Sequence, residues 1–288
     1  MYLSQRSPRA PSLIPPFVST RSWRTLVNVT RLSGTERTRP DRPGDAGYAR
    51  ASKRLQRLHE ARQVAGKSSA YAAVLDVRFK RIPHRVAFAL DRWPLEQRPV
   101  LDVGCSYGQA LLHFGSGSVG IDNAAEAVGF CRSIGLSAEL GDVEADGLDL
   151  IEAGAFEIVW VSDVLEHVDA PRLLLRRLAP KLRPNGRLLL HVSVLPRSRL
   201  VRAALRRKGM RPFDAEAHFH QFTTETAVHL LARAGYRVER LVVPMPAALD
   251  PISRLVPARI APRVFIEATP DTDLLSAAMR AEKRNKLI

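Results

Sequence analysis

The stretch that decides the fold is VLDVGCSYG, residues 100–108. Its first four residues form a short, mostly apolar run that predicts a buried β-strand, and Gly104 and Gly108 follow. Glycines at these positions permit a tight turn and a close approach of the backbone to a ligand. No Lys-Ser/Thr pair follows the second glycine, so this is not the phosphate-binding loop of nucleotide hydrolases. Two glycines alone are a weak signal, and the flanking sequence has to decide their meaning.

Downstream of this stretch, short β-branched or Leu-rich runs alternate with amphipathic stretches. This alternation predicts a mostly parallel sheet that is covered by helices on both faces. The predicted strands are residues 99–103, 118–122, 137–140, 156–162, 187–194, 237–243 and 263–268. The predicted helices are residues 107–115, 123–134, 170–183, 224–234 and 272–285, with two more upstream at 48–66 and at 69–91, the latter interrupted at Pro83.

Acidic residues stand at the ends of four successive predicted strands. They are Asp102, Asp122, Asp142 and Asp163. Ligands of open α/β sheets bind outside the carboxyl ends of the strands, where an Asp can accept hydrogen bonds from ribose hydroxyls or from an adenine amino group. A single acidic strand end is commonplace because Asp also caps helices. Four of them beside a Gly-rich turn predict a nucleoside-like ligand.

At these residues the chain resembles the class I S-adenosylmethionine-dependent methyltransferases over roughly residues 95–270. It is most similar to the small-molecule branch that includes the ubiquinone-biosynthesis O-methyltransferases. The resemblance implies an α/β, Rossmann-like, seven-stranded sheet, mostly parallel with an antiparallel last strand. It is carried by VLDVGCSYG (100–108), VGIDNA (119–124), ELGDVEA (139–145), FEIVWVSDVLEHV (156–168), LAPKLRPNGRLLLHV (178–192) and HFHQFTTETAVHLLARAGY (218–236).

The resemblance also implies S-adenosylmethionine as the cofactor and a role for each strand end. The turn would line the methionine end of the cofactor, Asp122 would hold the ribose, and the residues after the third and fourth strands would contact the adenine and close the pocket floor. One departure is that Ser106 replaces the usual middle glycine of the turn. The implied cofactor-binding residues are Asp102, Gly104, Cys105, Gly108, Asp122, Asn123, Asp142, Val143, Ser162 and Asp163.

Two histidines are the candidates for catalysis. A methyl sulfonium is already activated, so the protein has only to align the acceptor and remove a proton. His167 and His218 suit the role of general base because imidazole titrates near neutral pH. Two alternatives stay open: these histidines, together with Asp163, Glu166 and His220, hold a divalent metal, or the residues only make local hydrogen bonds. We expect no metal.

Residues 195–213 are rich in arginine and contain no acidic residue, and they follow the fifth predicted strand. Leu200 and Ala204 are four residues apart, as are Val201 and Leu205, so a helix here has one apolar face. A basic lid of this kind favours an acidic acceptor, an anionic lipid surface or RNA. A solvated basic helix that touches no substrate explains the pattern equally well. Residues 244–262 are long for a hairpin, and we expect a flap near the pocket.

Charge and composition limit the classes of protein that fit. The 288 residues are 45% apolar and 25% charged, which is typical of a globular protein, and two cysteines make neither a disulfide framework nor a zinc site by themselves. No apolar run reaches the roughly 18 residues that a membrane helix needs. The net charge is +15, of which residues 1–70 carry +10. The high isoelectric point therefore describes mainly the N-terminal arm and is weak evidence for nucleic-acid binding.

Four regions follow from these patterns: a disordered basic arm at 1–47, a helical N-terminal extension at 48–94, a methyltransferase domain at 95–270 and a C-terminal helix at 271–288. The arm fits a transit peptide, a basic tail or an over-long start. We expect a cytoplasmic enzyme that methylates a small molecule, most simply at oxygen. The alternatives are an RNA methyltransferase that grips phosphates with the arm and lid, a non-catalytic relative, and a polyamine synthase, which would need a more acidic pocket.

Overall fold

The computed structural model describes residue 56, residue 74 and residues 78–207, 218–244 and 256–285. The expected arm at 1–47 lies outside the described residues. So do the predicted helix at 48–66 apart from one residue, the last part of the basic segment 195–213, and most of the expected flap at 244–262. Within the described part, no helix is both long and apolar enough to cross a membrane.

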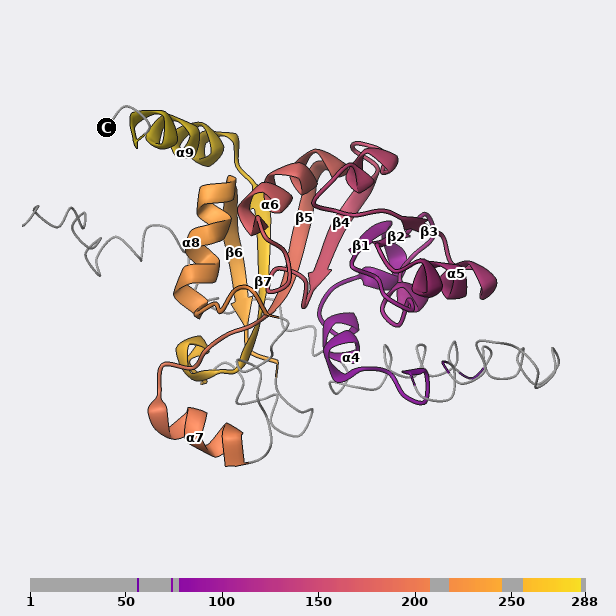
Figure 1. Cartoon of the computed structure of the whole chain (residues 1–288), viewed down its shortest axis with the longest axis horizontal. Coiled ribbons are helices and arrows are strands. Elements are labelled where there is room, and N and C mark those ends of the chain that lie inside the picture. Colours follow the sequence, from indigo (N-terminus) through magenta and orange to yellow (C-terminus); the bar gives the residue numbers. More distant parts are fainter. Residues whose placement is uncertain (1–55, 57–73, 75–77, 208–217, 245–255, 286–288) are drawn as a thin grey trace, which may run out of the picture.

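A seven-stranded sheet organises the chain, with the strand order β3-β2-β1-β4-β5-β7-β6 (Figure 1). The first five strands pair in parallel, and β7 runs antiparallel to both of its neighbours. The predicted mixed sheet with an antiparallel last strand is confirmed. The strands are β1 (Val100–Val103), β2 (Val119–Asp122), β3 (Ala138–Leu140), β4 (Phe156–Ser162), β5 (Leu182–Ser193), β6 (Tyr236–Val242) and β7 (Arg263–Pro270).

Helices cover both faces of this sheet, because alternate residues of the central strands are buried on opposite sides. On one face, Val159 and Leu188 belong to a core that α6 and α8 complete. On the other, Trp160 and Leu189 pack with the residues around α4. The described helices are α4 (His84–Leu90), α5 (Ala125–Ser133), α6 (Pro171–Leu178), α7 (Arg199–Arg207), α8 (Thr224–Ala234) and α9 (Thr272–Asn285).

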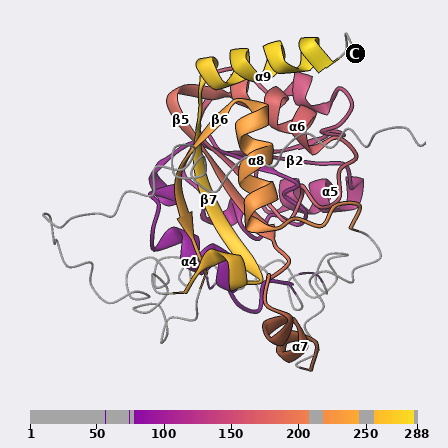
Figure 2. The same ribbon diagram turned by 90° about the vertical axis from the view of Figure 1, so that its left-hand side faces the viewer.

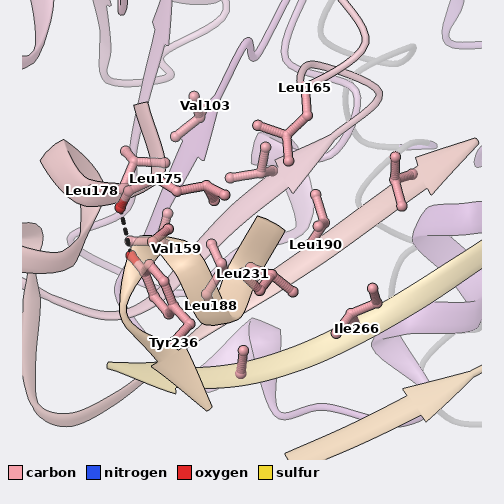
Figure 3. Close-up of a cluster of buried hydrophobic side chains, with 14 of the residues drawn as sticks. Val103, Val159, Leu165, Leu175, Leu178, Leu188, Leu190, Leu231, Tyr236 and Ile266 are labelled. Atoms are coloured by element: carbon pink, nitrogen blue, oxygen red, sulfur yellow. Dashed lines mark hydrogen bonds between the residues drawn. The ribbon is translucent and has the colours of Figure 1, made fainter. Parts of the chain in front are cut away.

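The larger core lies between the sheet and the pair α6 and α8. Figure 3 shows leucines and valines from β1, β4, β5 and both helices meeting there, with the ring of Tyr236 among them. The Tyr236 hydroxyl donates a hydrogen bond of 2.9 Å to the carbonyl oxygen of Leu175, so the only polar atom of this buried side chain is satisfied. Burial also raises the pKa of the Tyr236 hydroxyl. This core fixes the sheet that carries the strand ends.

Residues before the first strand also belong to the packed body. Phe88 of α4 stacks on Phe265 of β7 with ring centroids 5.4 Å apart. The Trp93 indole donates a hydrogen bond of 3.0 Å to Glu267, which lies in the same strand. The domain boundary at residue 95 stays a prediction. Residues from Phe79 onward nevertheless pack against the sheet and its covering helices.

Two predicted helices and the start of one predicted strand differ from the structure. The helix expected at 107–115 is absent, and the structure has only a short 3-10 turn at Leu111–His113. Gly108 has a positive φ of 77°, which an α-helix does not accept, so too few residues remain before the next turn at Gly115 for a stable helix. The helix expected at 170–183 ends at Leu178, and β5 begins at Leu182, five residues early. Pro180 lacks the N–H that a continuing helix would use.

The basic segment after β5 does form a helix, α7, as expected. None of its residues is buried, and Leu200 is 83% exposed. Both views show α7 standing away from the sheet (Figures 1 and 2). On the apolar face of α7, Leu200 and Ala204 are exposed and Val201 and Leu205 are only partly buried.

Candidate functional site

The Gly-rich turn after β1 is held against the neighbouring strand by its own backbone. The N–H groups of Gly104 and Cys105 both donate to the carbonyl oxygen of Ile121, at 2.8 and 3.1 Å. Gly104 has a φ of 70°, and a Cβ there would lie 2.7 Å from a methyl carbon of Val164. Only glycine satisfies both conditions without a shift of the surroundings. The turn is therefore a rigid edge between β1, β2 and the loop after β4.

Asp122, at the end of β2, ties this turn to the second strand. Its Oδ2 accepts a hydrogen bond of 2.8 Å from the backbone N–H of Ser106, and its Oδ1 accepts one of 2.9 Å from that of Ala124. The next residue, Asn123, is exposed. Each carboxylate oxygen has a second lone pair, so both can still accept a hydrogen bond from a ligand.

Ser106 is where the chain departs from a glycine-only turn, and the structure shows the consequence. Its φ is 48°, in the left-handed region that a residue with a Cβ pays about 1–2 kcal/mol to enter. Ser106→Gly removes that strain but loosens the unfolded chain, which costs about 0.5–1 kcal/mol. We expect Ser106→Gly to leave the free energy of unfolding unchanged or to raise it by up to about 1 kcal/mol. Ser106→Val should lower the free energy of unfolding. Denaturant titration of both variants measures these changes. A Ser106→Val variant as stable as the native protein would mean that the backbone at this position is not strained.

Asp102 is the most deeply buried carboxylate of the site, with 2% of the residue exposed. Burial raises its pKa to about 8, the charge of Asp122 adds to the rise, and the charge of Arg85 opposes it. Its Oδ2 is buried and has no hydrogen-bond partner among the described residues. An orphaned acceptor is costly unless a ligand satisfies it, and this one lies beside the turn.

Arg85 of α4 is a residue of the site that the sequence patterns did not identify. Its Nε lies 3.6 Å from Oδ2 of Asp163, and its charge also acts on Asp102. It thus places one cation between two acidic strand ends. Nothing in the spacing of α4 distinguishes this arginine from its neighbours, because the contact is to a residue 78 positions away.

The loop after β3 lies directly beside Asp122. The N–H of Gly141 donates to the carbonyl oxygen of Asp122 at 3.0 Å. Asp142 is exposed, and its Oδ1 accepts a hydrogen bond of 2.8 Å from the N–H of Glu144. Val143 packs against the core, and its carbonyl oxygen accepts a hydrogen bond from Arg177. The two residues expected at the adenine are therefore adjacent to the residue expected at the ribose.

The end of β4 contains a small polar cluster that is completed by β5. Nδ1 of His191 lies 3.2 Å from Oγ of Ser162 and 3.3 Å from Oδ1 of Asp163. Burial by itself raises the pKa of Asp163. The hydrogen bond and the charge of His191, together with the charges of Arg85 and Arg263, have the larger effect and lower the pKa to about 2. Asp163 is therefore a carboxylate at neutral pH. His191, which is 1% exposed, was not among the predicted residues; its only signal was a polar residue inside an apolar strand run.

The two histidines expected to act in catalysis do meet. The rings of His167 and His218 lie edge to face with centroids 4.6 Å apart. The segment of His218 is pinned beside β4 because the carbonyl oxygen of Glu166 accepts hydrogen bonds from the N–H groups of Phe219 and His220. The Glu166 carboxylate is itself buried and accepts a hydrogen bond of 2.7 Å from the N–H of Ser193. Burial raises the pKa of Glu166.

The cysteine expected at the cofactor lies beneath the turn. Cys105 is 5% exposed, and its thiol and that of Cys131 lie 3.6 and 3.3 Å from the carbonyl oxygen of Ser106. The hydrogen bond with Cys131, together with burial, raises the pKa of the Cys105 thiol. Its side chain therefore supports the turn, and only its backbone can face a ligand.

The alternative of a metal site finds no support in the part of the chain that the structure describes. No group of three or more His, Cys, Asp or Glu side chains there is arranged to hold a metal ion. Asp163 is engaged with His191 and Arg85, and Glu166 with the backbone of Ser193. Each carboxylate is therefore already engaged with protein groups.

Comparison with known proteins identifies the family of this chain. A family model described as a methyltransferase domain matches residues 75–241, which is more than half of the chain. The ubiquinone biosynthesis O-methyltransferase of Methylococcus capsulatus is 30% identical over 111 residues, 36% of this chain and 47% of the relative. The ubiquinone biosynthesis O-methyltransferase of Bordetella avium is 34% identical over 99 residues, which are 32% of this chain and 41% of the relative. The chain thus spans less than half the length of these curated relatives.

A solved structure shows the same fold. It is the methyltransferase of Haloferax volcanii in complex with the Trm112 methyltransferase activator, at 21% identity and a TM-score of 0.51. The match covers 70% of this chain and 95% of that one. Since the family model spans the Gly-rich turn and all four acidic strand ends, the chain belongs to the class I S-adenosylmethionine-dependent methyltransferases, a family of enzymes whose cofactor is S-adenosylmethionine.

Proposed function

We propose that this protein transfers a methyl group to an oxygen atom of a small molecule. The observation that carries the proposal is the hydrogen bond of 2.8 Å that the Asp122 carboxylate accepts from the Ser106 N–H in the Gly-rich turn. Beside it lies the buried oxygen of Asp102 that has no partner among the described residues. Oxygen and a small acceptor are supported by the relatives, which are named ubiquinone biosynthesis O-methyltransferases. The identity of the acceptor is left open by this proposal.

The described residues fit the parts of the cofactor, which supplies an activated methyl group when bound. Asp122 has acceptors to spare for the two ribose hydroxyls. Arg85 and Asp102 offer a cation and an acceptor, which is the complement of a zwitterionic amino-acid group. The turn residues Gly104, Cys105 and Gly108 would line the methionine end. The adenine and the pocket floor fall to the remaining residues of the set, which are Asn123, Asp142, Val143, Ser162 and Asp163.

We propose that His167 or His218 removes the proton of the acceptor hydroxyl. A hydroxyl attacks a methyl sulfonium only as its proton leaves, and a neutral imidazole can take that proton at physiological pH. His167 is exposed and His218 is half-buried, so the pair lies at the open side of the β4 end, where an acceptor can enter. The buried His191 is instead enclosed by Ser162, Asp163 and Phe265. It suits the role of holding Asp163 in place.

The raised pKa of Asp102 gives a prediction of pH dependence. A carboxyl whose pKa is about 8 in the folded protein and 3.8 when it is exposed to water binds more protons in the folded state. Its contribution to stability is present below pH 4 and is lost as the pH rises to about 8. We expect the free energy of unfolding of Asp102→Asn, relative to that of the native protein, to increase over this range in thermal or urea titrations.

Two further results would check this pH prediction. A cationic amino group bound beside Asp102 favours the ionised carboxylate, so saturating S-adenosylhomocysteine should shrink the difference between Asp102→Asn and the native protein. Parallel stability profiles from pH 4 to pH 8, without ligand, would mean that Asp102 is ionised in the free protein. That result would contradict the raised pKa on which this prediction rests.

The proposed function is tested by offering the protein labelled S-adenosylmethionine and a fractionated cell extract. We expect label to appear in a fraction of small molecules that is resistant to nuclease and protease. The Asp122→Ala variant is the matched control, and it should transfer no label at the same protein concentration. Label that is recovered only in RNA or only in protein would contradict a small-molecule acceptor. Label that is released by mild base as methanol would show a carboxyl oxygen as the acceptor atom.

A further inference from the structure

A hollow lies at the opposite end of the sheet from the site described above. Its volume is about 520 Å³, which is within the usual range for ligand pockets. It is formed where β4 and β5 begin, together with the segment that leads into β1. We call it the amino-end hollow, and the residues of its lining that matter here are Trp93, Arg98, Glu157, Ile158, Arg183 and Arg187.

The floor of the amino-end hollow is apolar and belongs to the packed core. Trp93 is 5% exposed, and its indole N–H is already bonded to Glu267. Ile158 and Leu189 are 5% and 1% exposed and belong to the same core cluster as Trp93. An apolar ligand group that reaches this floor would meet closely packed side chains, of which only small parts are exposed.

The rim carries more positive than negative charge. Three arginines and one glutamate, Glu157, line the hollow. Arg98 and Arg183 both pair with the Glu157 carboxylate, and a nitrogen of Arg183 lies 3.2 Å from Oε1 of Glu157. Arg187 pairs with the buried Glu267 and is 57% exposed. A guanidinium has five N–H donors, and each of these three makes one side-chain hydrogen bond among the described residues, so donors remain for an anion.

The backbone at the rim departs from a regular strand. The β4–β5 register passes from Phe156 opposite Leu182 to Ile158 opposite Arg187, so three extra residues bulge from β5. Asn185, within the bulge, has a φ of 65°. Bulges re-aim side chains, and this one carries Arg183 to the rim of the hollow.

We propose that the amino-end hollow binds a small phosphate monoester with an apolar body. Arg98, Arg183, Arg187 and Arg240 surround the carboxylates of Glu157 and Glu267. This excess of two positive charges matches a phosphate monoester, which carries nearly two negative charges at neutral pH. Guanidinium groups bind phosphate oxygens through paired N–H donors, and the floor of Trp93, Ile158 and Leu189 accepts the apolar body. The hollow is separate from the methyl-transfer site, because ligands of the fold bind at the carboxyl ends of the strands.

The test is a calorimetric titration of the full chain with phenyl phosphate in the presence of saturating S-adenosylhomocysteine. We expect a dissociation constant of about 1 mM or tighter, as suits a ligand of this size. Benzoate, with one negative charge, should bind at least about 10-fold more weakly, and phenol should not bind measurably. No binding of phenyl phosphate, or its displacement by S-adenosylhomocysteine, would overturn the proposal.

Variants locate the binding. Arg183→Gln leaves Glu157 paired with Arg98, so the fold should persist, and the melting temperature checks this. We expect the affinity for phenyl phosphate to fall by about 10–100-fold. Arg206→Gln on α7 removes the same charge far from the hollow and should leave the affinity unchanged. An equal loss of affinity in the two variants would show that phenyl phosphate is attracted only by the net charge of the protein. An unchanged affinity in Arg183→Gln would show that phenyl phosphate binds elsewhere. Either result would overturn the proposal.

Discussion

Replacing His167 and His218 together by alanine should lower the turnover number by about 10²–10⁴-fold, the usual scale for a lost general base. The two rings touch at 4.6 Å and come from segments 51 residues apart, so each can substitute in part for the other. The single variants should therefore lose less activity than the double variant. The affinity for S-adenosylhomocysteine should barely change, because neither ring belongs to the Gly-rich turn or to an acidic strand end.

The control for this experiment is His229→Ala, which removes an exposed histidine from α8. It should keep full turnover. Full turnover in the double variant would mean that alignment of acceptor and cofactor is the whole mechanism. Loss of native activity on addition of a chelator, with recovery on addition of Mg²⁺, would favour a metal instead, and Glu166→Ala would then be as damaging as the histidine changes.

Asp122→Ala should weaken the binding of S-adenosylhomocysteine by at least about 100-fold. Two charge-assisted hydrogen bonds to a ribose contribute roughly 1.5–3 kcal/mol each before water compensates. The same substitution leaves the N–H groups of Ser106 and Ala124 without their acceptor, so the turn loses its tie to β2 as well. Calorimetry measures the affinity, and the melting temperature reports on the turn.

Asp122→Asn separates these two contributions. Its amide oxygen can still accept one of the backbone hydrogen bonds, but its NH₂ group faces the other N–H. We expect an affinity between those of the native protein and Asp122→Ala. Asp149→Ala removes an acidic side chain that is 79% exposed, and it should bind S-adenosylhomocysteine normally. Native-like affinity in Asp122→Ala would contradict the place that we assign to the ribose.

The regular elements with strong patterns could be predicted from the sequence closely. The bounds predicted for β4, α8 and α9 are those of the structure, because an uninterrupted apolar run, a helical period closed by Gly235 and an amphipathic period are local signals. The segment 107–115 has a helical composition but contains Gly108, whose φ is positive and where an added Cβ would lie 2.7 Å from Leu136 and 2.9 Å from Cys131. A constraint imposed by packing cannot be read from a local pattern.

The site divides in the same way. Parallel strands bring their carboxyl ends to one edge, so the sequence by itself determined that Asp102, Asp122, Asp142 and Asp163 would lie there together. Only the tertiary structure decided what stands around them. It brought Arg85 from α4 to Asp163, His191 from β5 to the same carboxylate, and His218 to His167. The physical reason is that the positions of the strands along the chain follow from local hydrophobic periodicity, whereas these contacts join residues 28 to 78 positions apart and depend on how helices and neighbouring strands pack.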